Sequence, residues 1–148
     1  MTHHIRDLVL TIMLLLSAMQ AAAQSDFAIG ELFDGRFRNN PNAVETVISG
    51  DILKDTGLTL FRSIQIKNAT EADANIFSSL VKRDSAKALS REEKSVGNVL
   101  QGAFYELPPK GATRRYLIYI NRKQKGKDKI MLGYLEGKVS PEEVKDMI

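Results

Sequence analysis

Residue types that carry much of enzyme chemistry are missing or confined to one end of the chain. There is no cysteine and no tryptophan, and the only histidines are His3 and His4. No disulfide or thiol-linked lipid can therefore form. If the N-terminal segment is removed after export, no imidazole or thiolate remains, which excludes Ser-His and Cys-His catalysis and the usual zinc, copper and non-haem iron sites. We expect no catalytic residue, metal or cofactor.

Apolar runs long enough to cross a membrane are also missing. Leu8–Met19 is interrupted only by Thr11 and Ser17, but a span through ~30 Å of hydrocarbon needs ~20 apolar residues. After Gln20, the small residues Ala21, Ala22 and Ala23 follow, and Gln24 comes next. This order is typical of a secretory signal peptide. The alternative is an amphipathic or buried N-terminal helix that is not cleaved.

Cleavage between Ala23 and Gln24 removes a signal peptide of residues 1–23 and leaves residues 24–148 as one domain. The whole chain of 148 residues is 43% hydrophobic and 26% charged, which is enough apolar material for a single core. We expect a periplasmic or secreted protein that does not span the membrane after processing.

The pattern of apolar residues predicts an α+β fold with about five strands. Alternation with a period of two marks the strands, and the segments between them carry turn residues. The strands at 114–122 and 129–139 are apolar on both faces, whereas antiparallel sheets usually keep one face in water. Either the chain covers both faces itself, or a partner or second copy covers one of them. The predicted strands are 43–49, 58–67, 99–108, 114–122 and 129–139.

Three helices are expected beside this antiparallel sheet. An apolar stripe predicts an amphipathic helix over 69–84, with Thr70 and Asp73 as its capping box. A first helix follows Asp26, and Ser140 begins a last helix that Val144, Met147 and Ile148 dock on the core. Residues 85–95 are predicted to extend the middle helix or to form a surface loop. We expect the amphipathic helix and the terminal helices to pack on one face of the sheet.

Basic residues gather between Lys110 and Lys129, where eight Lys or Arg residues accompany one acid. An exported protein does not usually meet nucleic acid, so we expect the partner to be an envelope protein or an anionic envelope polymer such as lipid phosphate or acidic glycan. The alternative is that these lysines only keep a hairpin tip solvated. The candidate anion-binding residues are Arg114, Arg115, Arg122, Lys123, Lys125, Lys127 and Lys129.

A small hydrolase is the rival hypothesis to a non-enzymatic binding or interaction protein. Glu106 and Glu136 could support glycoside cleavage if they flanked one cleft. Ser79 and Lys82 have the S-x-x-K spacing of a Ser-Lys pair, but the abundance of serine and lysine makes one such tetrad expected by chance. The non-enzymatic alternative is therefore preferred.

The segments AFYELPPKG, RRYLIYINR and KIMLGYLEGKVSPEEVKDMI, in that order, resemble a small family of exported Bacteroidetes proteins with a domain of unknown function. The resemblance covers most of residues 24–148 and is clearest over 99–148. It implies an α+β domain in the cell envelope of a gut-type anaerobe, and it implies no catalytic residues.

Overall fold

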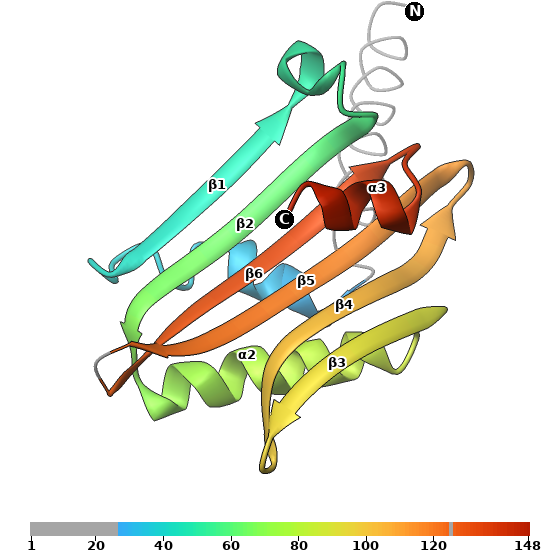
Figure 1. The fold of residues 1–148 in the computed structure, drawn as a ribbon. Helices are drawn as coiled ribbons and strands as arrows, with labels where there is room; N and C mark the ends of the chain where they lie inside the picture. The colour runs from blue at the N-terminus through green and yellow to red at the C-terminus, as the bar shows by residue number, and fades with distance from the viewer. Residues whose placement is uncertain (1–26, 125) are drawn as a thin grey trace, which may run out of the picture.

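The computed structural model describes residues 27–148 except position 125, and these form one six-stranded antiparallel sheet (Figure 1). The strand order is β1-β2-β6-β5-β4-β3, so the two strands predicted to be apolar on both faces lie in the interior of the sheet. The α+β class is confirmed. The strands are β1 (Ala43–Ser49), β2 (Leu58–Ala69), β3 (Ser90–Val96), β4 (Val99–Lys110), β5 (Thr113–Gln124) and β6 (Lys127–Gly137).

The sixth strand, β3, corrects the prediction of about five strands and of a helix or loop over 85–95. Its sequence SREEKSV has no apolar alternation, and every residue is exposed. Pairing with β4 from Ser90↔Glu106 to Val96↔Val99 forms the strand. A hydrophobic pattern cannot reveal a strand that an already ordered neighbour holds in place through backbone hydrogen bonds.

One face of the sheet, here the α2 face, is covered by helix α2 (Glu71–Ser85) and the short 3-10 helix η1 (Ala28–Phe33). The predicted capping box is confirmed, because Asp73 N–H donates to Thr70 Oγ1 and Thr70 N–H donates to Asp73 Oδ2, both at 3.1 Å. The buried residues of this face come from η1, α2 and four strands, and they include Ile29, Leu32, Ile64, Phe77, Val81, Tyr105, Leu117, Tyr119, Ile130 and Leu132.

The opposite face, the α3 face, carries helix α3 (Pro141–Asp146) and the 3-10 helix η2 (Gly50–Leu53). Val144 is fully buried there against a cluster that includes Tyr116 and Leu135. In Figure 1, α3 lies in front of the sheet, whereas α2 and η1 lie behind it. The prediction that the amphipathic and terminal helices share one face is therefore wrong for α3, whereas η1 does lie on the same face as α2. Met147 and Ile148 are exposed and do not dock α3.

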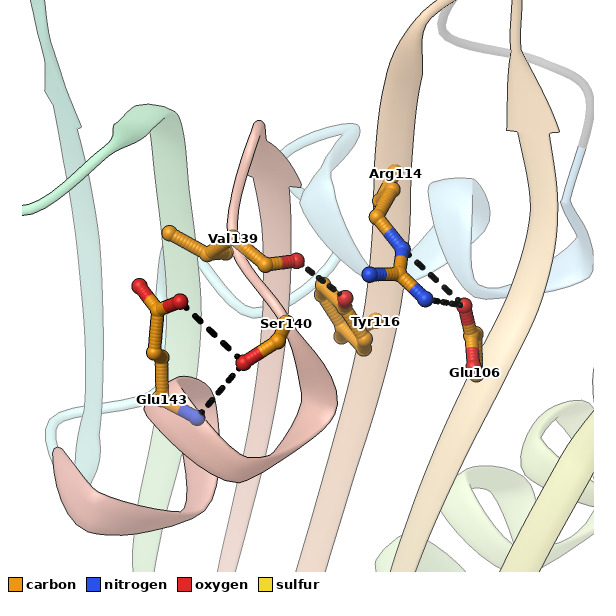
Figure 2. Close-up of polar contacts among 6 residues, drawn as sticks. All are labelled: Glu106, Arg114, Tyr116, Val139, Ser140 and Glu143. Carbon is orange, nitrogen blue, oxygen red and sulfur yellow. Dashed lines mark hydrogen bonds and ion pairs between the residues drawn. The ribbon is translucent and has the colours of Figure 1, made fainter.

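Two polar contacts hold α3 in place. Ser140 caps the helix by accepting from Glu143 N–H at 3.2 Å, and the Tyr116 hydroxyl donates to the Val139 carbonyl at 2.5 Å (Figure 2). Because helices lie on both sides, the two-sided apolar pattern of β5 and β6 is explained by coverage within the chain. A partner would therefore have less apolar surface to cover than if one whole face of the sheet were bare.

Helix η1 is shorter than the helix predicted after Asp26, a residue outside the described range. Gly30 and Gly35 weaken a longer α-helix, and no side chain caps η1. Instead Asp84 on α2 accepts from Ala28 N–H at 2.7 Å and from Ile29 N–H at 2.8 Å. This carboxylate therefore ties the start of the domain to α2.

The predicted signal peptide, residues 1–23, lies outside the described residues and stays a prediction. Among the residues that the structure describes, no helix is both long and apolar enough to span a bilayer.

Candidate functional site

The seven candidate anion-binding residues fall into two groups at opposite ends of β5. Arg114 is paired with Gly137 at one end, and Arg122 is paired with Lys129 near the β5–β6 turn. The two arginines are eight residue steps apart along the strand, which corresponds to about 26 Å. The structure therefore does not bring the seven residues together in one surface.

Arg114 is engaged in an ion pair within the chain (Figure 2). Its Nη2 and Nε donate to Glu106 Oε1 at 2.8 and 3.2 Å. The hydrogen bond to Glu106 raises the pKa of Arg114. This arginine neutralises a carboxylate that is only 16% exposed, so little of its charge remains for a partner.

Arg115 points to the other face and is 5% exposed. Its Nε donates to the Pro108 carbonyl at 2.7 Å, and its guanidinium lies 4.3 Å from the centre of the Phe27 ring. Stacking of a guanidinium on an aromatic face is favourable. Arg115 thus fixes the start of the domain and serves a structural role.

The remaining basic residues surround the β5–β6 turn. Residues paired across antiparallel strands point to the same face, and the face alternates along each strand. Arg122, Lys127 and Lys129 therefore face the α3 side, as the pair Tyr116↔Leu135 does, while Lys123↔Asp128 faces the α2 side. Lys125 lies outside the described residues.

We call Arg122, Lys127 and Lys129 the basic row. Arg122 and Lys127 are exposed, and Lys129 is half-buried. Within the described residues, no carboxylate forms an ion pair with any of the three. Three positive charges on one face of one hairpin create a local positive potential that favours an anionic group.

Next to the basic row, the α3 face has a strip of two rows of residues, of which the row nearer to the β5–β6 turn is only partly buried. The rows of paired residues run from Gly102 through Ile120 and Met131 to Gln65, and from Ile118 through Gly133 to Ser63. We call this strip, made of these seven residues, the open floor. Ile120 and Met131 are only partly buried, whereas Ile118 in the second row is 6% exposed, and Tyr116 and Leu135, nearer to α3, are 0% and 3% exposed.

Sequence reasoning identified the charges of the basic row but missed the open floor. Gly102 and Gly133 have no side chains, so at these two positions of the strip the surface lies closer to the backbone than at its neighbours. A glycine inside a strand often marks a site where a ligand or backbone comes close. That signal was available in the sequence of both strands.

The carboxylates of the rival hydrolase hypothesis do not meet. Glu106 pairs with Tyr116 and faces the α3 side, whereas Glu136 pairs with Arg115 and faces the α2 side. Glu136 accepts the Tyr134 hydroxyl at 2.5 Å. Two carboxyl groups on opposite faces of a sheet cannot flank one glycosidic bond, so this pairing is wrong.

The Ser-Lys alternative gains no geometric support. Ser79 and Lys82 are both exposed on α2, and neither belongs to the residues that line a pocket next to β1 on the α2 face. In residues 27–148, position 125 aside, no group of three or more acidic side chains is placed to hold a metal ion.

A pocket of about 320 Å³ lies beside the edge strand β1 on the α2 face. Phe33 and Phe37 contribute aromatic rings, Ile64 contributes an apolar side chain from β2, and Glu45 contributes a carboxylate from β1. The sequence did not predict that these residues form a pocket, because they come from separate segments of the chain.

The chain belongs to a family of unknown function (DUF6108), whose match covers residues 16–148. No curated protein and no solved structure shows significant similarity to it. The expectation of a domain of unknown function is thus confirmed, and the Bacteroidetes origin and the export of the chain stay predictions.

Proposed function

We propose that this protein is a non-enzymatic interaction module of the cell envelope that binds an anionic partner on its α3 face. The observation that supports this is the basic row of Arg122, Lys127 and Lys129 beside the open floor. No carboxylate among the described residues forms an ion pair with these three side chains. Next to them, Ile120 and Met131 stay partly accessible. A partner with anionic groups and some apolar surface fits this combination.

The site offers binding but little catalytic chemistry. Its cations can neutralise phosphate or carboxylate groups, and Ile120 and Met131 can contact apolar atoms. The titratable residues nearest to α3 are already engaged, since Glu106 pairs with Arg114 and the Tyr116 hydroxyl donates to Val139. The hydrolase alternative would need another pair of reactive groups.

Export is part of the same proposal and has its own test. The apolar run of Leu8–Met19 and the three alanines at 21–23 support a cleaved signal peptide. Phe27, three residues after Gln24, is 8% exposed and belongs to the core, so cleavage there would leave the domain whole. Mass spectrometry of the native protein should find Gln24 as the first residue in an envelope or extracellular fraction. An intact N-terminus in the cytoplasm would contradict export.

Binding is tested by comparing two triple variants that lose equal charge. In the first, Arg122, Lys127 and Lys129 become Ser. In the control, the exposed residues Lys54, Lys110 and Lys138 become Ser. The probes are vesicles containing an anionic phospholipid and a soluble acidic polysaccharide, each measured at low and physiological salt.

The basic-row variant should lose at least tenfold in affinity for one of these probes, whereas the control should stay within threefold of the unmodified protein. Binding should also weaken as salt increases, because the interacting charges are exposed and screened. Equal losses in both variants would show that net charge alone attracts the probe, and they would contradict a defined site.

A further inference from the structure

The two edges of the sheet are built differently. The outer strand β3 carries four charged residues in seven, which discourages pairing with another strand. The outer strand β1, with the sequence AVETVIS, carries only one charged residue, Glu45. Its Val44 and Val47 are 56% and 55% exposed. Strand β1 is therefore an edge that lacks the usual protection.

The backbone of β1 presents free hydrogen-bonding groups outward. Lys67 N–H donates to the Asn42 carbonyl at 3.0 Å, which fixes every second pair of the β1–β2 register as hydrogen-bonded. Glu45 and Val47 fall on the other pairs, so their N–H and C=O groups point away from β2. In the described chain, no turn or loop hydrogen bond reaches either residue.

The pocket on the α2 face adjoins this edge. Ala43 and Glu45 of β1 help to line it, together with Ile64 from β2 and the rings of Phe33 and Phe37. Side chains of a strand added to β1 would alternate between the two faces. Those on the α2 face would stand at the pocket, which has room for one apolar or aromatic side chain.

The charges around the pocket favour an acidic neighbour for that side chain. Glu45 already interacts with Arg62 at 3.5 Å, and the Arg62 guanidinium lies 4.5 Å from the centre of the Phe33 ring. Arg38 also lines the pocket, and within the described residues it forms no ion pair. One cation is thus left to receive a carboxylate from a partner.

We propose that β1 and its pocket bind an extended peptide segment of another protein by strand addition. The peptide supplies an apolar or aromatic side chain to the pocket and, two residues away on the same face, an acidic side chain to Arg38. Backbone hydrogen bonds to Glu45 and Val47 provide affinity, and the pocket provides selectivity, as in other complexes of this type. This surface is separate from the basic row, so either proposal can fail without the other.

The test uses a phage library of random heptapeptides selected on protein produced from the full-length gene. Selected peptides should alternate β-branched residues with an aromatic or large apolar residue two positions from Asp or Glu. Fluorescence anisotropy then measures their affinity for variants. Val47→Pro removes an outward N–H that β2 does not use, and Val47→Lys adds an edge charge at an exposed position without that backbone constraint.

Both Val47 variants should bind selected peptides at least tenfold more weakly while keeping the circular dichroism of the unmodified protein. Arg38→Ser should weaken an Asp-containing peptide at least threefold more than its Asn counterpart, and Arg36→Ser is the matched control that should change neither. Bound peptide should slow the hydrogen exchange of the Glu45 and Val47 amides. A library that yields no such sequences, or peptides that bind Val47→Lys as before, would overturn the proposal. So would a dimer that Val47→Lys dissociates, because a second copy would then occupy the edge.

Discussion

Replacing Asp84 with Asn tests how helix η1 is attached to α2 and the rest of the domain. Asp84 is 1% exposed, and its two oxygens accept separate backbone N–H groups from Ala28 and Ile29. Burial raises the pKa of this carboxyl group, while the two N–H donors oppose that rise. An asparagine has one acceptor oxygen, so one buried N–H would lose its partner and face an amide NH₂ instead.

The expected cost follows from the bonds lost. A hydrogen bond to a charged group contributes about 1.5–3 kcal/mol, so Asp84→Asn should lower the free energy of unfolding by about 2–3 kcal/mol. The apolar side chains of Phe27, Ile29 and Leu32 stabilise η1 by about 5–9 kcal/mol through burial. Because this exceeds the loss, η1 should stay docked and the cost should appear in global unfolding.

Urea denaturation followed by circular dichroism measures this change. Asp55→Asn, in an exposed loop, is the matched control and should stay within about 0.5 kcal/mol. Hydrogen exchange should show faster exchange at the Ala28 or Ile29 amide in the Asp84 variant only. A stability within about 0.5 kcal/mol of the unmodified protein, together with unchanged exchange at both amides, would refute the anchoring role.

Three further predictions concern stability. Burial raises the pKa values of all four tyrosines above the ordinary value of 10.0. The folded state therefore keeps protons that the unfolded state releases, and the free energy of unfolding should fall as pH rises past 10. Phenolate absorbance should appear only as circular dichroism is lost, and phenolate absorbance that appears while the circular dichroism is intact would refute this prediction. Gly137→Ala should lower the free energy of unfolding in urea by at least about 2 kcal/mol, because a Cβ there would lie 2.4 Å from the Gly57 carbonyl oxygen. Gly133→Ala should be tolerated, because the atom nearest to its new Cβ, the Cβ of Ile118, lies 3.8 Å away. Equal costs for the two variants would contradict the close approach of Gly137 to Gly57. Glu92→Ala removes an exposed ion pair with Lys145 and should cost at most about 1 kcal/mol, a bound that thermal unfolding can check. The four tyrosines are Tyr105, Tyr116, Tyr119 and Tyr134.

The regular elements with strong local patterns were predictable from the sequence. The stripe of Phe77, Leu80 and Val81 and the capping box at Thr70 produced the helix that the structure contains. The five patterned strands were also located, because burial of alternate side chains leaves a period of two. These features depend on residues within one segment, so a single sequence carries them.

Features that depend on distant segments were not predictable in the same way. Ser90–Val96 forms a strand because β4 pairs with it, and the opposite placement of α3 follows from how Val139 and Val144 close over Tyr116. The basic residues stand out in the sequence, but their division between the two ends of β5 depends on strand register. That register places Arg115 under Phe27 and Arg122 beside Lys129.

The most direct test of the proposed anion-binding face is a nuclear magnetic resonance titration of the ¹⁵N-labelled protein with whichever anionic probe it binds. Saturable amide shifts should concentrate at the basic row and the open floor, and they should disappear when Arg122, Lys127 and Lys129 are replaced by Ser. Shifts spread evenly over exposed lysines, or centred on α2, would contradict the assignment of this face.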